Sequence, residues 1–368
     1  MGHLTIAKRQ VLETLAERLD KNPVGAVINE TLFQILHILY SMEEAEIGSK
    51  FPMRPVALDE LAQAAGVDKV ELEGHLENMA SKGLVIDVPR RGAVYYMLSP
   101  VVIGFFEYTF MRVNDKLPMQ ELAELFNRYH HEQGVPEAFF GSDTKLFHTL
   151  AYEQFMPDDI KTEVLSYEKA SDIIRDSGGG SLTMCYCRHQ AQHLGTNCDA
   201  PIEDICMSLG GAAEWLVRRG FARPATVDEM LRALDRSAEH GLVHLGDNVQ
   251  NNPAYICNCC GCCCGVLRSI REHGIDAVHP SNFVPQVDAE RCTACGACVK
   301  RCQIDAISLV EINGKKMAVV DEKRCIGCGL CIGGCKKEAI ALHRKEELYV
   351  PPQNKKEQMM MIAAGRKK

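Results

Sequence analysis

Hydrophobic residues near the start of the chain recur at three- and four-residue intervals. Leu12, Leu15 and Leu19 follow this spacing, and so do the apolar residues between 32 and 39. This is the period of an α-helix with one buried face. The pattern therefore predicts two amphipathic helices at the start of the protein.

Shorter helical patterns follow at 58–65 and 69–81, and residues 85–98 then form two runs rich in β-branched and aromatic residues around Arg90-Arg91-Gly92. Two such runs on either side of a turn are typical of a β-hairpin. Two helices followed by a hairpin resemble a winged helix. Residues 1–113 are therefore expected to form a mostly helical domain with a winged-helix-like unit.

Winged helices often bind DNA through their second helix. Here that helix and its cap carry four acidic residues, which are Asp68, Glu71, Glu73 and Glu77. Acidic side chains would repel the phosphates of DNA. The formal net charge of −8 also disfavours nucleic acid as the main partner. We expect this unit to dock on protein, and DNA is an unlikely partner.

The middle of the chain is rich in cysteine. Residues 114–181 are expected to form a helical connector, and a glycine-rich break then opens a cysteine-rich domain, 182–285, which is also expected to be helical. Its ten candidate metal ligands are Cys185, Cys187, Cys198, Cys206, Cys257, Cys259, Cys260, Cys262, Cys263 and Cys264. Neighbouring side chains point in different directions, so these thiols cannot all bind one metal. One or two 4Fe-4S clusters are predicted here, with zinc or free thiols as alternatives.

The spacing C-x-x-C-x-x-C-x-x-x-C occurs twice near the C-terminus. The eight positions are Cys292, Cys295, Cys298, Cys302, Cys325, Cys328, Cys331 and Cys335. Such a set is typical of two cubane iron–sulfur clusters. Between the two copies, residues 309–320 alternate around Asn313-Gly314, which predicts a hairpin with a two-residue turn.

Residues 286–343 resemble bacterial-type two-cluster 4Fe-4S ferredoxins. The resemblance implies a βαβ fold and low-potential transfer of single electrons. It also implies that the fourth cysteine of each run crosses to the other cluster, so Cys335 joins the first triplet and Cys302 the second. The family usually has proline after each fourth cysteine, whereas this chain has Gln303 and Lys336.

The whole chain resembles a group of iron–sulfur binding proteins of strict anaerobes that combine a winged-helix-like front, a cysteine-rich middle and a terminal ferredoxin. The middle match rests on 185–189, 198–201 and 256–264. Cys259-Cys260-Gly261 is also similar to the CCG motif of heterodisulfide reductases, although that family needs two such motifs. A catalytic middle domain therefore stays open as an alternative.

Eighteen cysteines without a secretory signal favour metal ligation in a reducing cytoplasm over disulfides. Such thiolates oxidise readily, so an anaerobic host is expected. No apolar run is long enough to span a bilayer. Residues 344–368 are expected to form a solvated basic tail.

The sequence contains no dinucleotide fingerprint, P-loop or nucleophile elbow. We therefore expect a multi-domain α+β electron-transfer protein without catalytic residues of its own. It would relay single electrons as a subunit or partner of an anaerobic oxidoreductase complex, with a flavoprotein or metalloenzyme as redox partner. A reductase with catalysis at the middle cysteines and a redox-sensing winged-helix regulator are the alternatives.

Overall fold

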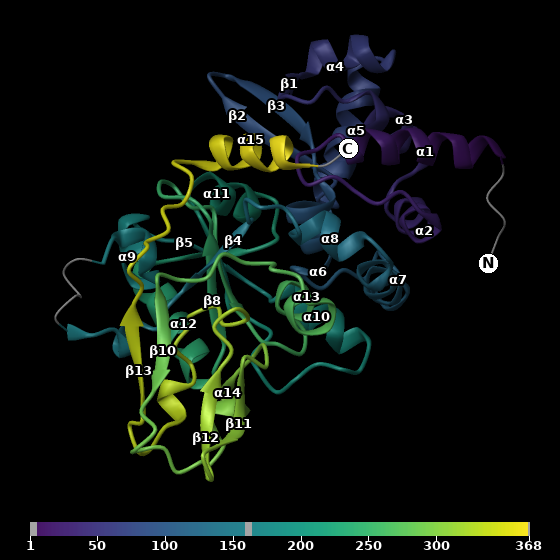
Figure 1. The fold of residues 1–368 in the computed structure, drawn as a ribbon. Coiled ribbons are helices and arrows are strands. Elements are labelled where there is room, and N and C mark those ends of the chain that lie inside the picture. The colour runs from purple at the N-terminus through teal and green to yellow at the C-terminus, as the bar shows by residue number, and fades with distance from the viewer. Residues whose placement is uncertain (1–5, 159–163, 367–368) are drawn as a thin grey trace.

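The computed structural model describes residues 6–158 and 164–366 (Figure 1). The N-terminal unit contains the helices α1 (Ile6–Asp20), α2 (Glu30–Leu39), α3 (Met42–Lys50), α4 (Leu58–Ala65) and α5 (Lys69–Ser81). Its three-stranded sheet consists of β1 (Val56–Ala57), β2 (Val85–Arg90) and β3 (Ala93–Leu98), in the order β1-β3-β2. Asn29 caps α2 by accepting a hydrogen bond from the Leu32 N–H, and Gly66 ends α4 in the left-handed conformation.

Three helical segments connect this unit to the middle of the protein. They are α6 (Phe106–Phe110), α7 (Met119–His131) and α8 (Val135–Phe140), and a kinked segment, η1 (Val101–Phe105), precedes them. Phe106 of α6 stacks on Phe126 of α7 with ring centroids 4.1 Å apart. These aromatic side chains belong to a hydrophobic core that runs without interruption into the N-terminal unit.

A six-stranded antiparallel sheet forms the middle of the molecule. Its strands are β4 (Phe147–Leu150), β5 (Gly180–Thr183), β6 (Cys206–Leu209), β7 (Arg223–Ala225), β8 (Val243–Asp247) and β9 (Tyr255–Cys259), in the order β4-β8-β9-β6-β5-β7. The associated helices are α9 (Ala170–Asp176), α10 (Tyr186–His193), α11 (Gly210–Arg218), α12 (Val227–Glu239) and α13 (Gly265–His273).

The prediction of a helical connector and a helical middle domain is therefore wrong. Residues 114–181 contribute β4 to the sheet, and residues 182–285 supply the central strands. Strands β4, β6 and β8 are buried along their whole length. A strand that is buried on both faces does not alternate between apolar and polar residues, so its sequence lacks the period that would reveal it.

The C-terminal unit is built from two antiparallel strand pairs. Strand β10 (Phe283–Val287) pairs with β13 (Ile340–Arg344), and β11 (Ile307–Ile312) pairs with β12 (Lys315–Val320). The short helices α14 (Ala297–Arg301) and η5 (Ile332–Gly334) lie between the strands. Asn313 and Gly314 form the two-residue turn with φ values of 51° and 76°, as expected for a type I′ hairpin.

The last residues do not form a solvated tail, so that prediction is also wrong. Helix α15 (Lys355–Gly365) packs back on the protein (Figure 1), and Arg366, directly after it, reaches Asp20 of α1. Gln358 is fully buried and donates to the carbonyl of Lys145 at 3.1 Å. Arg366 binds Asp20 at 2.5 Å. Lys355, which pairs with Asp247, and Arg366 thus serve contacts within the chain.

Within the described residues, no helix has the length and apolar character needed to cross a membrane.

Candidate metal centres

The eight cysteines of the C-terminal unit gather into two groups. The first, called the outer quartet, is Cys292, Cys295, Cys298 and Cys335, and these residues line one small cavity together with Leu309 and Ile340. Cys295 is exposed to solvent. Ala294 and Gly296, on either side of it, have φ values of 55° and 75°, which lets the loop curl around the cavity.

The second group, called the inner quartet, is Cys302, Cys325, Cys328 and Cys331. Cys331 lies close enough to the other three for their charges to act on it. Burial raises the pKa of the Cys328 thiol to about 12. A thiolate is stable in such a place only when it binds a cation, because a metal deprotonates the thiol that it coordinates. The inner quartet therefore has the chemistry of a buried metal site.

The inner quartet faces the middle sheet. The Tyr152 N–H, just after β4, donates to the carbonyl of Cys328 at 3.0 Å. Cys302, Cys325 and Cys328 pack against the hydrophobic core that contains the middle cysteines. The two quartets therefore differ in exposure: one reaches the surface, and the other adjoins the cysteine-rich region.

Backbone N–H groups donate to the ligand sulfurs in a repeated pattern. Ala306 donates to Cys302 at 3.2 Å and Ala339 donates to Cys335 at 3.2 Å, in both cases four residues after the cysteine. Hydrogen bonds to thiolate sulfur are one means by which a protein tunes the potential of an iron–sulfur cluster. The internal duplication thus extends beyond the cysteines to the groups that support them.

The ten middle cysteines separate into a group of six and a group of four. In the group of six, called the thiol ring, each sulfur has two neighbouring sulfurs that act on its pKa, and the sequence of neighbours closes on itself. The order around the ring is Cys185, Cys187, Cys264, Cys259, Cys257 and Cys206.

Strand register explains part of the ring. Cys257 and Cys259 point to the same face of β9 because they are two residues apart. Met207 pairs with Ile256, which places Cys206 of β6 opposite Cys257. Two helix starts complete the ring, since Cys185 caps α10 and Cys264 caps α13. The positive end of a helix dipole favours a thiolate at each of these caps.

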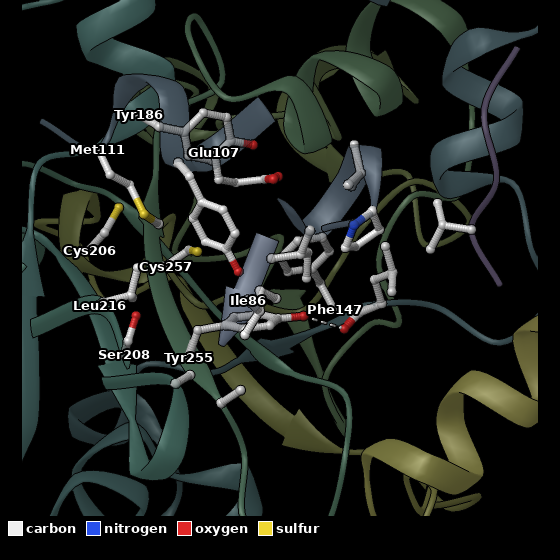
Figure 2. Close-up of a pocket in the computed structure, with 18 of the residues that line it drawn as sticks. Ile86, Glu107, Met111, Phe147, Tyr186, Cys206, Ser208, Leu216, Tyr255 and Cys257 are labelled. Carbon is white, nitrogen blue, oxygen red and sulfur yellow. Dashed lines mark hydrogen bonds between the residues drawn. The ribbon is translucent and has the colours of Figure 1, made fainter. Parts of the chain in front are cut away.

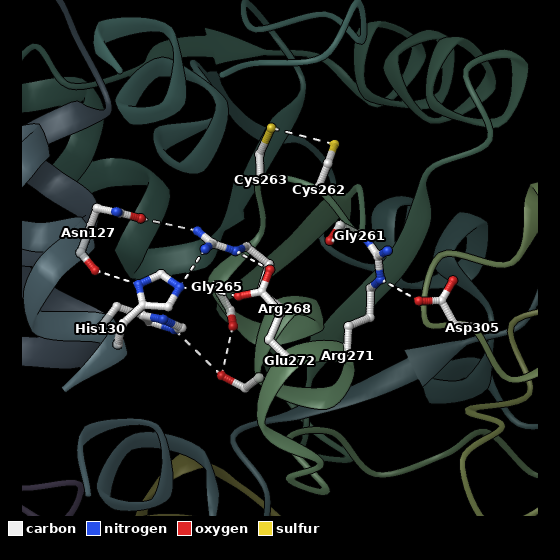
Figure 3. Close-up of polar contacts among 12 residues, drawn as sticks. Asn127, His130, Gly261, Cys262, Cys263, Gly265, Arg268, Arg271, Glu272 and Asp305 are labelled. Atoms are coloured by element: carbon white, nitrogen blue, oxygen red, sulfur yellow. Dashed lines mark hydrogen bonds and ion pairs between the residues drawn. The ribbon is translucent and has the colours of Figure 1, made fainter. Parts of the chain in front are cut away.

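The remaining four cysteines form a compact group, called the thiol tetrad. Cys198, Cys260, Cys262 and Cys263 bring their sulfurs within 4.8 Å of one another. Figure 3 shows Cys262 and Cys263 side by side in the loop before α13. Adjacent residues therefore serve different groups: Cys259 belongs to the ring and Cys260 to the tetrad.

Arg188 lies between the ring and the tetrad and is fully buried. Its Nη1 is 3.6 Å from the Cys260 sulfur, and its Nε donates to the Pro201 carbonyl at 2.8 Å. Burial alone would lower the pKa of Arg188, but the thiolates of Cys185, Cys206 and Cys260 raise it overall. Arg188 is thus a permanent positive charge that both groups share.

All six ring cysteines line a cavity of about 490 Å³ (Figure 2). Sequence reasoning missed Glu107, which also lines this cavity and accepts a hydrogen bond from the Gly104 N–H at 2.7 Å. Burial raises the pKa of Glu107 to about 8. In Figure 2 its carboxyl lies beside the Tyr186 hydroxyl. The sequence offered one signal for a buried carboxyl at this position, which is that Glu107 stands between the aromatic residues Phe106 and Tyr108.

The C-terminal unit docks on the loop that carries the tetrad. Gly261 donates its N–H to the Gln303 side chain at 2.8 Å, and Gln303 donates to the Gly241 carbonyl at 3.0 Å. Arg271 of α13 pairs with Asp305 at 2.9 Å (Figure 3). Gln303 is the residue that stands where the ferredoxin family usually has proline. Here its side chain joins the two units, which a proline could not do.

The outer quartet and the thiol ring each line a cavity, and backbone N–H groups donate hydrogen bonds to cysteine sulfurs of the C-terminal unit. These features are typical of an iron–sulfur protein. Residues 275–339 match the family model of the 4Fe-4S dicluster domain. The chain therefore contains a ferredoxin-like domain that binds 4Fe-4S clusters. No curated protein and no solved structure matches the chain.

Proposed function

We propose that this protein transfers single electrons between a redox partner and a 4Fe-4S cluster that cysteines of the thiol ring would hold in its middle domain, as part of an anaerobic oxidoreductase system. The observation that carries the proposal is the placement of the inner quartet, with Cys328 held to Tyr152 beside the middle sheet. A ferredoxin-like domain that only exchanged electrons with solution would not need this contact.

The residues of the two quartets would hold one 4Fe-4S cluster each. When bound, such clusters accept and release single electrons at low potential. Cys335 and Cys302 would cross between the two runs, because each lies with the triplet of the other run. The exposed loop around Cys295 would be the surface for a flavoprotein or metalloenzyme partner.

The chain supplies the surroundings that electron transfer requires. Burial of Cys328 and Cys331 keeps water away from the inner quartet. Four backbone N–H groups donate to Cys292, Cys302, Cys325 and Cys335. The fully buried Arg188 offsets negative charge in the middle domain.

Iron, acid-labile sulfide and zinc per chain should be measured on protein purified without oxygen, followed by redox titration with electron paramagnetic resonance detection. We expect at least about eight irons and eight sulfides from the two quartets, with reversible low-potential signals. Fewer than about eight irons per chain would contradict the proposal. The absence of new paramagnetic signals after reduction with a low-potential donor would contradict it as well.

The cavity favours reduction of a small molecule at the thiol ring as a second candidate function. Its volume lies in the range of ligand-binding sites. The protonated Glu107 faces that space, and cleavage of a disulfide to two thiols consumes two electrons and two protons. The ferredoxin-like domain would deliver the two electrons one at a time, Glu107 would supply one proton and solvent water the other.

Turnover with an artificial electron donor and a small organic disulfide separates the two functions. A reductase should show turnover that Glu107→Gln removes without loss of iron. Glu137→Gln, at an exposed position of α8, is the matched control and should keep full turnover. If the protein only transfers electrons, the wild-type protein, Glu107→Gln and Glu137→Gln should all show no turnover.

A further inference from the structure

The thiol tetrad differs from the other cysteine groups because its four sulfurs all lie near one another. The sulfurs of Cys198 and Cys260 lie 3.6 Å apart, as do those of Cys262 and Cys263. Cys263 lies 4.0 Å from Cys198. All four sulfurs lie within 4.8 Å of one another. Four points that are all mutual neighbours form the corners of a tetrahedron, with room for one ion at its centre.

We propose that Cys198, Cys260, Cys262 and Cys263 bind a single divalent metal ion, zinc or iron, in a closed tetrathiolate site. A tetrahedron with metal–sulfur bonds of about 2.3 Å has edges of about 3.8 Å. Three of the six sulfur–sulfur separations are 3.6, 3.6 and 4.0 Å, which lie on either side of this value, and the other three are at most 4.8 Å. Tetrahedral coordination by four thiolates is the preferred geometry of zinc and is also used by iron.

A cubane cluster would need the opposite arrangement. Each of its thiolates binds a different iron, so the cluster holds the four sulfurs apart. The outer quartet of this chain has such an arrangement, because its cysteines surround a cavity. The thiol ring is open as well, because its six cysteines line the large cavity and each sulfur has two neighbouring sulfurs around the cycle. The tetrad is the group in which the sulfurs converge on one point.

The charges around the tetrad support the same conclusion. Four thiolates and one divalent ion leave a net charge of about −2 by charge counting. Arg188 places its guanidinium 3.6 Å from Cys260 and is held there by the carbonyls of Pro201 and Asn258. A buried positive charge needs a negative partner, and an anionic metal site at the tetrad would supply one for the fully buried Arg188.

A closed site of this kind is structural, because no coordination position is left for a substrate. The ion would fix the 260–263 loop to Cys198. Gly261 belongs to this loop and hydrogen-bonds Gln303 of the ferredoxin-like domain. The proposed ion therefore holds the surface on which that domain docks, and a zinc ion there would take no part in electron transfer because zinc has no redox chemistry. This goes beyond the proposed function.

The test begins with the intact wild-type protein, purified without oxygen. X-ray absorption at the zinc edge should show about one zinc per chain with four sulfur neighbours at about 2.3 Å. If iron occupies the site, Mössbauer spectra should show about one iron per chain in the form of a mononuclear tetrathiolate. If neither form is found, the proposal is overturned, and this result needs no variant to fold.

Cys262→Ala then tests the ligands, because Cys262 is the exposed member of the tetrad. It should remove about one metal ion and leave acid-labile sulfide unchanged. Cys295→Ala, at the exposed position of the outer quartet, is the matched control and should remove about four irons with four sulfides. Loss of four irons and four sulfides from Cys262→Ala, or no loss of metal, would refute a single-ion site. Failure of the Cys295→Ala control alone would instead count against the proposed function.

Discussion

The contact between the N-terminal unit and the middle domain depends on one buried carboxylate, Asp87 of β2. Its side chain is 5 % exposed. It accepts hydrogen bonds from Trp215 Nε1 at 2.9 Å, from Arg219 Nε at 2.8 Å and from Arg218. Arg219 also pairs at 2.7 Å with Glu77, which is 68 % exposed. These four interactions join β2 and α5 to the C-terminal end of α11.

Asp87→Asn should weaken this contact strongly. Removal of one partner from a buried ion pair costs about 3–5 kcal/mol, because the other charge is left without compensation. Arg218 is 39 % exposed, so solvent screens its share and we take the lower end of the range. A cost of about 3 kcal/mol increases the local opening of the interface by about 100-fold.

Hydrogen exchange followed by mass spectrometry measures this opening on peptides from β2, β3 and α11. Glu77→Gln is the control, because an exposed ion pair contributes at most about 1 kcal/mol and its loss should change exchange less than tenfold. The reasoning is refuted if Asp87→Asn and Glu77→Gln accelerate exchange equally, or if the effect of Asp87→Asn spreads evenly over the whole chain.

The same contact should depend on pH. Burial alone would raise the pKa of Asp87, but the hydrogen bonds from Arg219, Arg218 and Trp215 lower it overall. A folded-state pKa below the unfolded value means that the contribution to stability is complete above pH 3.8 and is lost as the pH falls through the folded pKa. Asp87→Asn should lack this acid-dependent part of the opening.

Three further outcomes are expected. Cys295→Ala should remove about four irons and leave the metal of the middle domain unchanged, as measured by metal analysis; equal loss from both regions would mean that they are not separate metal sites. Gly261→Ala should separate the tetrad loop from the ferredoxin-like domain, because its Cβ would lie 1.9 Å from the Gln303 carbonyl oxygen. Faster exchange around Gln303 would show this, whereas Gly74→Ala, with open space at a helical position, should be neutral or stabilising by up to about 1 kcal/mol. Gln358→Leu should lower the free energy of unfolding by about 1–3 kcal/mol, because it removes the donor that Gln358 supplies to the buried carbonyl of Asn248; an unchanged thermal midpoint would contradict this.

Features that depend on a few consecutive residues could be predicted from the sequence alone. The helices at Leu58–Ala65 and Lys69–Ser81 begin and end where their apolar spacing and caps predict. The turn at Asn313-Gly314 follows from the need for positive φ at both residues. The metal chemistry of the C-terminal unit follows from cysteine spacing, because ligands that are close in sequence can reach one cluster without knowledge of the fold.

Contacts between distant segments could not be predicted in this way. The division of the ten middle cysteines depends on how β6, β9, α10 and α13 meet, so that Cys206 faces Cys257 and Cys198 meets Cys260. Glu107 becomes part of a cavity only when burial isolates it from water. The sequence by itself determined the kinds of ligand present and the local elements that carry them. Only the tertiary structure decided which ligands share a site, because strand pairing and helix packing bring together residues whose separation along the chain carries no signal of their contact.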